Sequence, residues 1–320
     1  MSGLTRRLVL VLLLAVLIYG GFVVVTGYQE IRVTLRSFRY SALALALSLA
    51  TLNYLLRFLK WEYYLARLQI QGLAKWDSLL VFLSGFVLTI TPGKVGEVFK
   101  SAVLARTHGV PVARSAPIIV AERLTDVMGI IVLILVGSLG FGGGLMWAGL
   151  GTACVLFGLL FILWERPARW AFARLRRSRA KSWAARLETA HESLRLLASP
   201  PALILPTLIS ILAWGAEGLA LYVLLRGFGA QASVTTSLFF YATATLAGAL
   251  IPVPGGLGVT EALIQEQLVR LAHVAQGVAT ASMLLVRLAT LWWAVLIGFV
   301  ALALIRRRHR VLLDEPVQRF

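Results

Sequence analysis

Long apolar runs recur along this chain of 320 residues, and they constrain its fold more than any other feature. A helix needs roughly 20 mostly apolar residues to cross a bilayer. Six segments have about that length: 8–26, 40–59, 112–137, 145–164, 203–225 and 278–305. In hydrocarbon each backbone polar group needs an internal partner, so such segments fold as helices. We therefore expect an all-α polytopic membrane protein with about six spans.

The first run, 8–26, has two interpretations. Arg6 and Arg7 precede it, and basic residues precede the apolar run both in membrane helices and in secretory signal peptides. The run is longer than the usual apolar core of a signal peptide, and no small-residue cleavage site ends it. We favour a permanent helix and keep the cleaved signal as the alternative.

Two Pro-Gly segments break apolar stretches that are otherwise helical in pattern. They are Pro92-Gly93-Lys94-Val95-Gly96-Glu97 and Pro252-Val253-Pro254-Gly255-Gly256-Leu257-Gly258. Around the first break, neither 78–91 nor 95–107 is long enough to cross alone. Irregular backbone at membrane depth is tolerated only where protein or a water-filled cavity surrounds it. Each break therefore predicts a re-entrant hairpin, although 233–251, before the second break, is nearly long enough to span by itself.

The two breaks resemble copies of one unit. Arg123 follows Glu97 by 26 residues, and Arg287 follows Glu261 by the same interval. The six-span order makes the first hairpin enter from the cytoplasmic side and the second from the outer side. This arrangement predicts an inverted repeat, the architecture of many transporters with a midplane site. A chance resemblance between two Pro-Gly turns is the alternative, because both residues are common in membrane helices.

The net charge of +17 resides mostly outside the apolar runs. A high isoelectric point often indicates nucleic-acid binding, but these basic residues flank membrane segments, so we expect no nucleic-acid partner. The segment 166–195 holds eight Arg and one Lys against two Glu, which predicts a cytoplasmic loop. Both termini then lie in the cytoplasm, and the loop is either a simple topology anchor or a lipid-binding segment. Arg32, Arg36 and Arg39 break the charge pattern and predict an interfacial segment.

These features divide the chain into five parts. We expect a first span with an interfacial segment (1–39), a first repeat (40–164), a basic loop (165–199), a second repeat (200–305) and a basic tail (306–320).

The breaks also predict a binding chemistry. A helix N-terminus carries unpaired N–H groups and a partial positive charge, and it binds phosphate or carboxylate. Lys94 adds a mobile cation, and the planar guanidiniums of Arg123 and Arg287 suit phosphate. An anionic lipid headgroup is therefore the expected ligand.

Charged residues within apolar runs are costly and should be paired or face a wet cavity. We expect Glu97 to pair with Arg123 and Glu261 with Arg287, either to contact substrate or only to hold each hairpin. A polar stripe on the second span consists of Asn53, Arg57, Lys60 and Trp61, with Arg57 expected to face the cavity. Interfacial anchoring is the alternative for Lys60 and Trp61. The candidate substrate-binding residues are Asn53, Arg57, Pro92, Gly93, Lys94, Gly96, Glu97, Glu122, Arg123, Asp126, Glu217, Pro254, Gly255, Gly256, Gly258, Glu261 and Arg287.

Enzyme signatures are not found in the sequence. There is no HExxH, Walker or GxSxG motif. The four histidines, His108, His191, His273 and His309, are far apart, and Cys154 is the only cysteine. We therefore expect no catalytic residue, no metal site, no cofactor and no disulfide.

At the two breaks, at Asn53 and Arg57, and at Glu122-Arg123 with Asp126, the sequence resembles the lysylphosphatidylglycerol synthase transmembrane, or flippase-like, family. The resemblance spans roughly residues 5–308 and implies lipid movement across a bacterial or archaeal cytoplasmic membrane. Two-domain members also carry a soluble aminoacyl-transferase, which we do not expect in this chain. The function expected is thus a flippase-like lipid transporter. The alternative is a membrane subunit or enzyme of lipid modification, such as an aminoacyl-lipid, glycosyl-lipid or hopanoid pathway, with a biosynthetic enzyme as partner.

Overall fold

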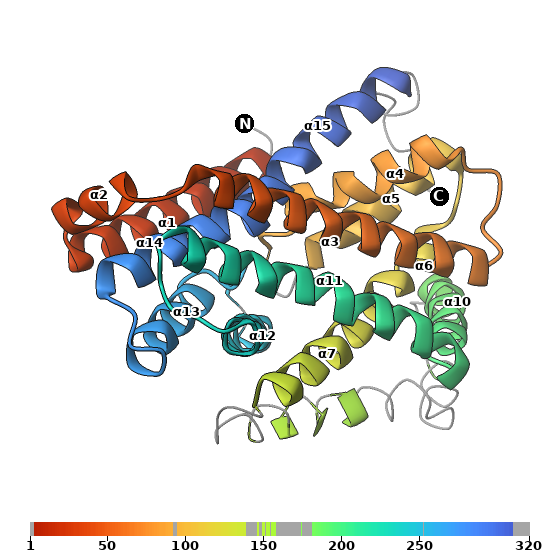
Figure 1. Ribbon diagram of the computed structural model, residues 1–320. Coiled ribbons are helices and arrows are strands. Elements are labelled where there is room, and N and C mark those ends of the chain that lie inside the picture. Colours follow the sequence, from red (N-terminus) through yellow and green to blue (C-terminus); the bar gives the residue numbers. More distant parts are fainter. Residues whose placement is uncertain are drawn as a thin grey trace.

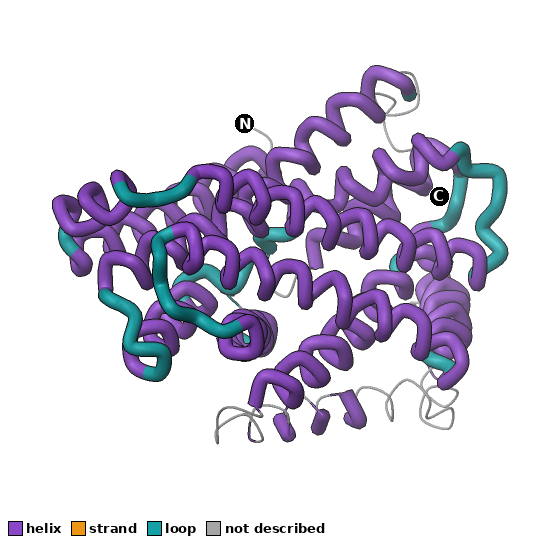
Figure 2. Tube along the Cα trace, viewed as in Figure 1, coloured by secondary structure: helices purple, strands orange, loops and turns teal. Residues whose placement is uncertain are grey.

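A computed structural model describes residues 3–91, 95–138, isolated positions between 146 and 174, 181–251 and 253–309. Within these residues every regular element is a helix (Figures 1 and 2). They are α1 (Gly3–Thr26), α2 (Tyr28–Arg36), α3 (Tyr40–Arg67), α4 (Lys75–Ser84), η1 (Gly85–Leu88), η2 (Val95–Val98), α5 (Phe99–His108), α6 (Val112–Ser115), α7 (Pro117–Ser138), α10 (Lys181–Leu197), α11 (Pro200–Gly227), α12 (Val234–Leu250), α13 (Val259–Arg270), α14 (Gln276–Arg287), η3 (Leu288–Trp292) and α15 (Trp293–Arg308).

Three of these helices are long and apolar enough to cross a membrane. They are α3, α11 and the continuous helix Gln276–Arg308 formed by α14, η3 and α15. The bent pair α1 and α2, which meet at 88°, adds a fourth if it is one span. The chain is therefore an all-α, multi-pass membrane protein, as the apolar runs predicted. Helix α3 continues to Arg67, eight residues beyond the predicted end of that run.

Two further predicted spans, 112–137 and 145–164, are not established as membrane-crossing helices. Helix α7 is 22 residues long, but Glu122, Arg123 and Asp126 interrupt its apolar character. The predicted span 145–164 lies largely outside the described residues. The total of six spans and the re-entrant course of the two hairpins therefore stay predictions.

Short helices flank both Pro-Gly breaks. Around the first break, α4 and η1 lead in, and η2 and α5 lead out. Around the second, α12 ends at Leu250 and α13 begins at Val259. Gly255, Gly256 and Gly258 have φ of +62°, +68° and +86°, a left-handed conformation that glycine adopts without strain. The turn at the second break therefore requires glycine at these three positions.

Helices α3 and α11 pack side by side through the middle of the molecule, and α7 crosses beneath α11 (Figure 1). The amide of Asn53 in α3 donates to the carbonyl of Ala213 in α11 at 2.9 Å. At the crossing with α7, a Cβ on Gly129 would lie 2.9 Å from Cβ of Ser210. Small residues thus allow the backbones to approach closely, as is usual between membrane helices.

The segment 165–199 was expected to be a basic loop, but part of it is helical. Helix α10 covers Lys181–Leu197 and contacts α6 and α7. Leu197 is fully buried in this packing. A polar composition therefore concealed an amphipathic helix, because its apolar face is narrow.

Helix α15 packs directly on the first hairpin. A Cβ on Gly298 would lie 2.6 Å from the Val87 nitrogen and 2.9 Å from the Phe86 carbonyl carbon. We expect Gly298→Ala to lower the unfolding midpoint, because backbone atoms of η1 cannot move aside as a flexible side chain can. Gly215→Ala is the matched control, since its nearest atom would lie 3.9 Å away. Thermal unfolding in detergent checks this, and equal midpoints for the two variants would contradict the close contact.

Candidate functional site

The described residues line an open cavity of about 320 Å³ between the helices. This volume lies at the lower end of the range of small-ligand sites. Its walls come from α3, η1, α7, α11, α12, the second break, α13 and the Gln276–Arg308 helix. Most of the lining is apolar, but five charged residues face it: Arg57, Arg123, Asp126, Glu217 and Arg287.

The chain beside both Pro-Gly breaks reaches this cavity. Thr89 and Thr91 line it directly before the first break, and Gly255 and Gly256 line it from the second. These two segments also touch, because a Cβ on Gly255 would lie 3.5 Å from Cα of Ile90. Pro92, Gly93 and Lys94 lie outside the described residues, and Gly96 belongs to η2. Two segments some 160 residues apart in sequence thus share one cavity.

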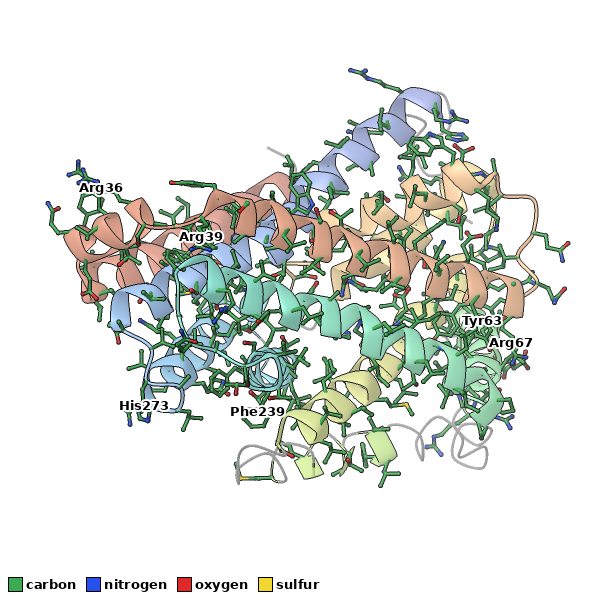
Figure 3. The ribbon with its side chains drawn as sticks, viewed as in Figure 1. Arg36, Arg39, Tyr63, Arg67, Phe239 and His273 are labelled. Carbon is green, nitrogen blue, oxygen red and sulfur yellow. The ribbon has the colours of Figure 1, made fainter. Side chains whose placement is uncertain are left out.

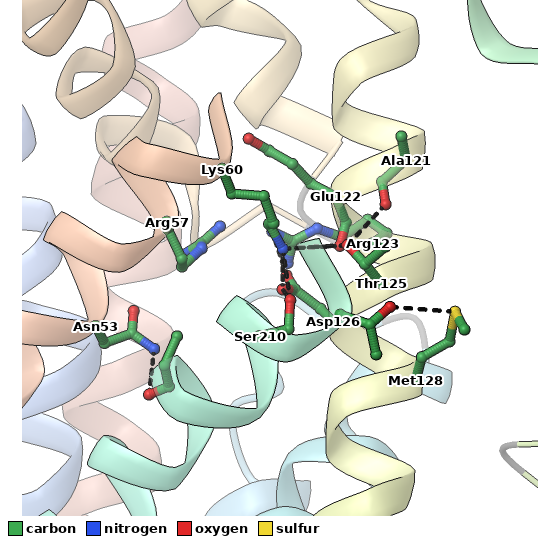
Figure 4. Close-up of polar contacts among 12 residues, drawn as sticks. Asn53, Arg57, Lys60, Ala121, Glu122, Arg123, Thr125, Asp126, Met128 and Ser210 are labelled. Atoms are coloured by element: carbon green, nitrogen blue, oxygen red, sulfur yellow. Dashed lines mark hydrogen bonds and ion pairs between the residues drawn. The ribbon is translucent and has the colours of Figure 1, made fainter. Parts of the chain in front are cut away.

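A buried network of charges joins Glu97, at the end of the first break, to α3 and α7. Figure 4 shows the part of this network at Arg57, Lys60, Arg123 and Asp126. Oε2 of Glu97 lies 3.4 Å from Nη2 of Arg57 and 3.3 Å from Nη2 of Arg123, so the predicted Glu97–Arg123 pair is present. Arg123 also pairs with Asp126 at 2.9 Å. The carboxylate of Glu97 is therefore shared between two guanidiniums, at distances longer than the usual 2.7–2.9 Å of a strong charged pair.

Two lysines complete this network. Nζ of Lys60 lies 2.6 Å from Asp126 and 2.7 Å from the Ser210 hydroxyl. Nζ of Lys100 lies 2.7 Å from Glu122. Four cations and three carboxylates thus meet around the first break, which leaves one excess positive charge among the described members of the network. The interpretation of Lys60 and Trp61 as interfacial anchors was wrong, since both are fully buried.

The arginines of the cavity have unused donors. Among the described residues, Nε of Arg57 and Nε of Arg123 are buried without a hydrogen-bond partner. Buried donors nearly always find an acceptor in a working protein. The side chain of Arg123 is 25% exposed, whereas those of Arg57 and Arg287 are 6% and 8% exposed. Arg123 is thus the cavity arginine most open to an incoming anion.

The second break has a self-contained charge pair. Nε of Arg287 donates to Glu261 at 2.6 Å, which confirms the second predicted pair, and Nη2 donates to the Gly255 carbonyl at 2.8 Å. The other carboxylate oxygen of Glu261 accepts the Gly258 N–H at 2.7 Å. Glu261 therefore caps the start of α13 and occupies part of the helix end that we expected to hold an anion.

Glu217 faces the cavity from α11. The Tyr241 hydroxyl donates to its carboxylate at 2.6 Å, and both residues are buried. This contact joins α11 to α12 across the cavity wall. Tyr54 also lines the cavity and donates to the Thr290 carbonyl at 2.6 Å.

The candidate residues whose side chains the structure describes therefore form two groups. Those that line the cavity are Arg57, Arg123, Asp126, Glu217, Gly255, Gly256 and Arg287. Those that lie behind the lining are Asn53, Glu97, Glu122, Pro254, Gly258 and Glu261. Within the second group, Glu97 pairs with Arg57 and Arg123, and Glu261 pairs with Arg287.

Several residues of the site were missed in the sequence. Lys100 follows Glu97 by three residues, a spacing that places two charges on one helix face and could have indicated its role. Ser210, Tyr54 and Tyr241 carry no charge, and their spacing in the apolar runs gives no comparable signal.

Comparison with known proteins identifies the family of this chain. A search of curated proteins finds no match to the chain. The model of the lysylphosphatidylglycerol synthase TM region matches residues 11–298, and this range contains both breaks and every charged residue of the cavity. The chain belongs to the family of the lysylphosphatidylglycerol synthase TM region.

Proposed function

We propose that this protein is a flippase-like lipid transporter that moves an anionic phospholipid or a polyprenyl-phosphate-type lipid across the cytoplasmic membrane. The observation that carries the proposal is the shared cavity, which the chain beside both breaks reaches and three arginines line. The headgroup enters the cavity while the acyl or prenyl tails remain in the bilayer. The protein acts without catalysis, and its partners are membrane lipids and a lipid-biosynthesis enzyme.

The network around Glu97 supports exchange of one anion for another. Arg57 and Arg123 share one carboxylate at 3.4 and 3.3 Å, and each has a free Nε donor among the described residues. A phosphate offers several acceptor oxygens, and guanidinium binds them through two N–H groups at once. A headgroup phosphate that enters from the cavity side can therefore take over both arginines in exchange for Glu97.

The inverted repeat gives this cavity access to both leaflets. The first hairpin enters from the cytoplasm and the second from the outside, and both termini are cytoplasmic in a bacterial or archaeal inner membrane. Two opposed hairpins that meet at Ile90 and Gly255 can expose the cavity alternately to either side.

The family's description favours one alternative function. The description names a synthase, and a membrane subunit that presents a lipid to a modifying enzyme would also need a headgroup site. The two functions differ in a reconstituted system, because a presenting subunit alone does not move lipid between leaflets.

Purified protein in vesicles tests the proposal. We expect faster exposure of labelled anionic phospholipid than in protein-free vesicles, and no such acceleration for a zwitterionic lipid. Arg123→Gln should slow exposure about tenfold to a hundredfold, because a charged hydrogen bond contributes about 1.5–3 kcal/mol. Arg270→Gln is the control, since Arg270 pairs with Glu266 on the surface and its side chain is 75% exposed. Equal rates for the two variants would contradict the role of Arg123.

A further inference from the structure

A cluster of two histidines and one carboxylate lies away from the cavity, where the first hairpin meets the end of α15. Asp77 is in the first turn of α4, His108 ends α5, and His309 follows α15. Each residue offers one ligand atom, and these atoms lie within 4.8 Å of one another. The histidines are far apart in sequence, which is why a metal site was not expected. We propose that this cluster binds a divalent transition-metal ion of the Zn²⁺ class.

The chemistry of the cluster fits such an ion. Two imidazoles and one carboxylate form a common three-ligand set for Zn²⁺, with a water or another ligand as the fourth. Hard ions such as Mg²⁺ and Ca²⁺ prefer oxygen ligands throughout, so imidazoles select against them. Ligands bound to one Zn²⁺ at about 2.1 Å lie roughly 3.4 Å apart in a tetrahedron. The ligand atoms, which lie within 4.8 Å of one another, therefore need to approach by at most about 1.4 Å.

Two atoms of the cluster lack hydrogen-bond partners. Among the described residues, Nε2 of His309 is buried without one, and Oδ1 of Asp77 makes an ion pair with Arg308 but no well-aligned hydrogen bond; Asp77 is 7% exposed. Nε2 of His309 lies 3.7 Å from Oδ2 of Asp77. A buried carboxylate and a buried imidazole nitrogen that face each other without a hydrogen bond are what a bound metal ion would join.

Neighbouring groups already orient the ligands. The Thr107 hydroxyl lies 2.9 Å from the Val103 carbonyl and 2.7 Å from Nδ1 of His108. With the hydroxyl proton on Val103 and Nδ1–H donating to Thr107, Nε2 of His108 keeps the lone pair that binds a metal. Desolvation and the nearby His309 lower the pKa of His108, which favours the neutral imidazole that metals bind. Arg308 lies 2.8 Å from Oδ1 of Asp77 and can keep this contact while Oδ2 binds the ion.

The position of the site indicates what binding would do. Its ligands come from the start of α4, the end of α5 and the end of the last long helix. A bound ion would therefore fasten both limbs of the first hairpin to α15. We therefore expect metal binding to raise the free energy of unfolding even when the cavity holds no lipid.

Metal titration of the full chain in detergent tests the inference. The protein should carry no polyhistidine tag, and Co²⁺ absorption with Zn²⁺ competition reports binding. We expect one bound ion per chain and a rise in the unfolding midpoint when Zn²⁺ is added. Asp77→Asn, His108→Ala and His309→Ala should each remove saturable binding and the rise, and Thr107→Val should weaken binding about tenfold.

His273→Ala is the matched control, because His273 lies between α13 and α14, at the opposite end of the molecule from α4 and the end of α15 (Figures 1 and 3). It should bind metal as the wild type does. His309→Ala must elute as a single species and unfold at the wild-type midpoint without metal, which separates lost binding from lost folding. If the wild type binds no Co²⁺ or Zn²⁺, or if His309→Ala and His108→Ala bind as well as His273→Ala, the site is refuted.

Discussion

Replacement of Arg287 by Met is expected to lower the free energy of unfolding by about 3–5 kcal/mol, because it leaves the carboxylate of Glu261 buried without its guanidinium partner. The side chain of Glu261 is fully buried and that of Arg287 is 8% exposed. Arg287 also holds the Gly255 carbonyl at 2.8 Å, so the second break loses a backbone contact as well. Chemical unfolding in mixed micelles measures the loss.

A double variant separates the cost of the unpaired Glu261 charge from the loss of the contacts that Arg287 makes. Glu261→Gln together with Arg287→Met removes both charges, and we expect it to recover most of the lost stability. The double variant should still fail to transport, because the cavity has lost an arginine. If Arg287→Met alone unfolds at the wild-type denaturant concentration, the pair does not stabilise the second break.

Replacement of Lys60 by Met is expected to have a similarly large effect at the first break. The ammonium of Lys60 is fully buried and contacts Asp126 and Ser210, so its removal leaves Asp126 with Arg123 and the Ser210 hydroxyl as partners. We expect a loss of about 3–5 kcal/mol. Arg123 would then be held more tightly by Asp126, and headgroup binding should weaken as a second consequence.

Lys75→Met is the matched control for Lys60. Lys75 also pairs with a carboxylate, Glu62, but its side chain is 82% exposed. Exposed pairs contribute at most about 1 kcal/mol, so this variant should unfold near the wild-type denaturant concentration. Equal losses for the two lysine variants would show that burial does not set the energy of the Lys60–Asp126 pair.

The sequence predicted the parts of this protein that depend on local pattern. The membrane helices follow from the length of the apolar runs, and the two breaks follow from Pro and Gly. The pairs Glu97–Arg123 and Glu261–Arg287 were predictable because buried charges need partners and the 26-residue interval repeats. Each of these predictions uses a pattern within one segment or a spacing that occurs twice, so none requires knowledge of how the helices pack.

The remainder depends on how distant helices pack. Lys60 at the end of an apolar run has the composition of an interfacial anchor, and only the crossing of α3, α7 and α11 makes it a buried partner of Asp126. His108 and His309 are 201 residues apart and meet because α15 returns to the first hairpin. The cap that Glu261 forms on α13 depends on backbone geometry at Gly258, which the residue pattern does not specify.

The central claim is that the two breaks meet at one cavity, and a disulfide between them tests it most directly. A Cβ on Gly255 would lie 3.7 Å from Cβ of Ile90, within the 3.5–4.5 Å that a disulfide requires. We would introduce Ile90→Cys and Gly255→Cys with Cys154→Ser, and a protease site in the exposed turn at Gln231. Under mild oxidation the two fragments should stay linked after cleavage, and lipid exposure in vesicles should stop until a reductant is added. Fragments that separate under oxidation, in a protein that elutes and unfolds like the single-cysteine variants, would contradict the shared cavity and the account built on it.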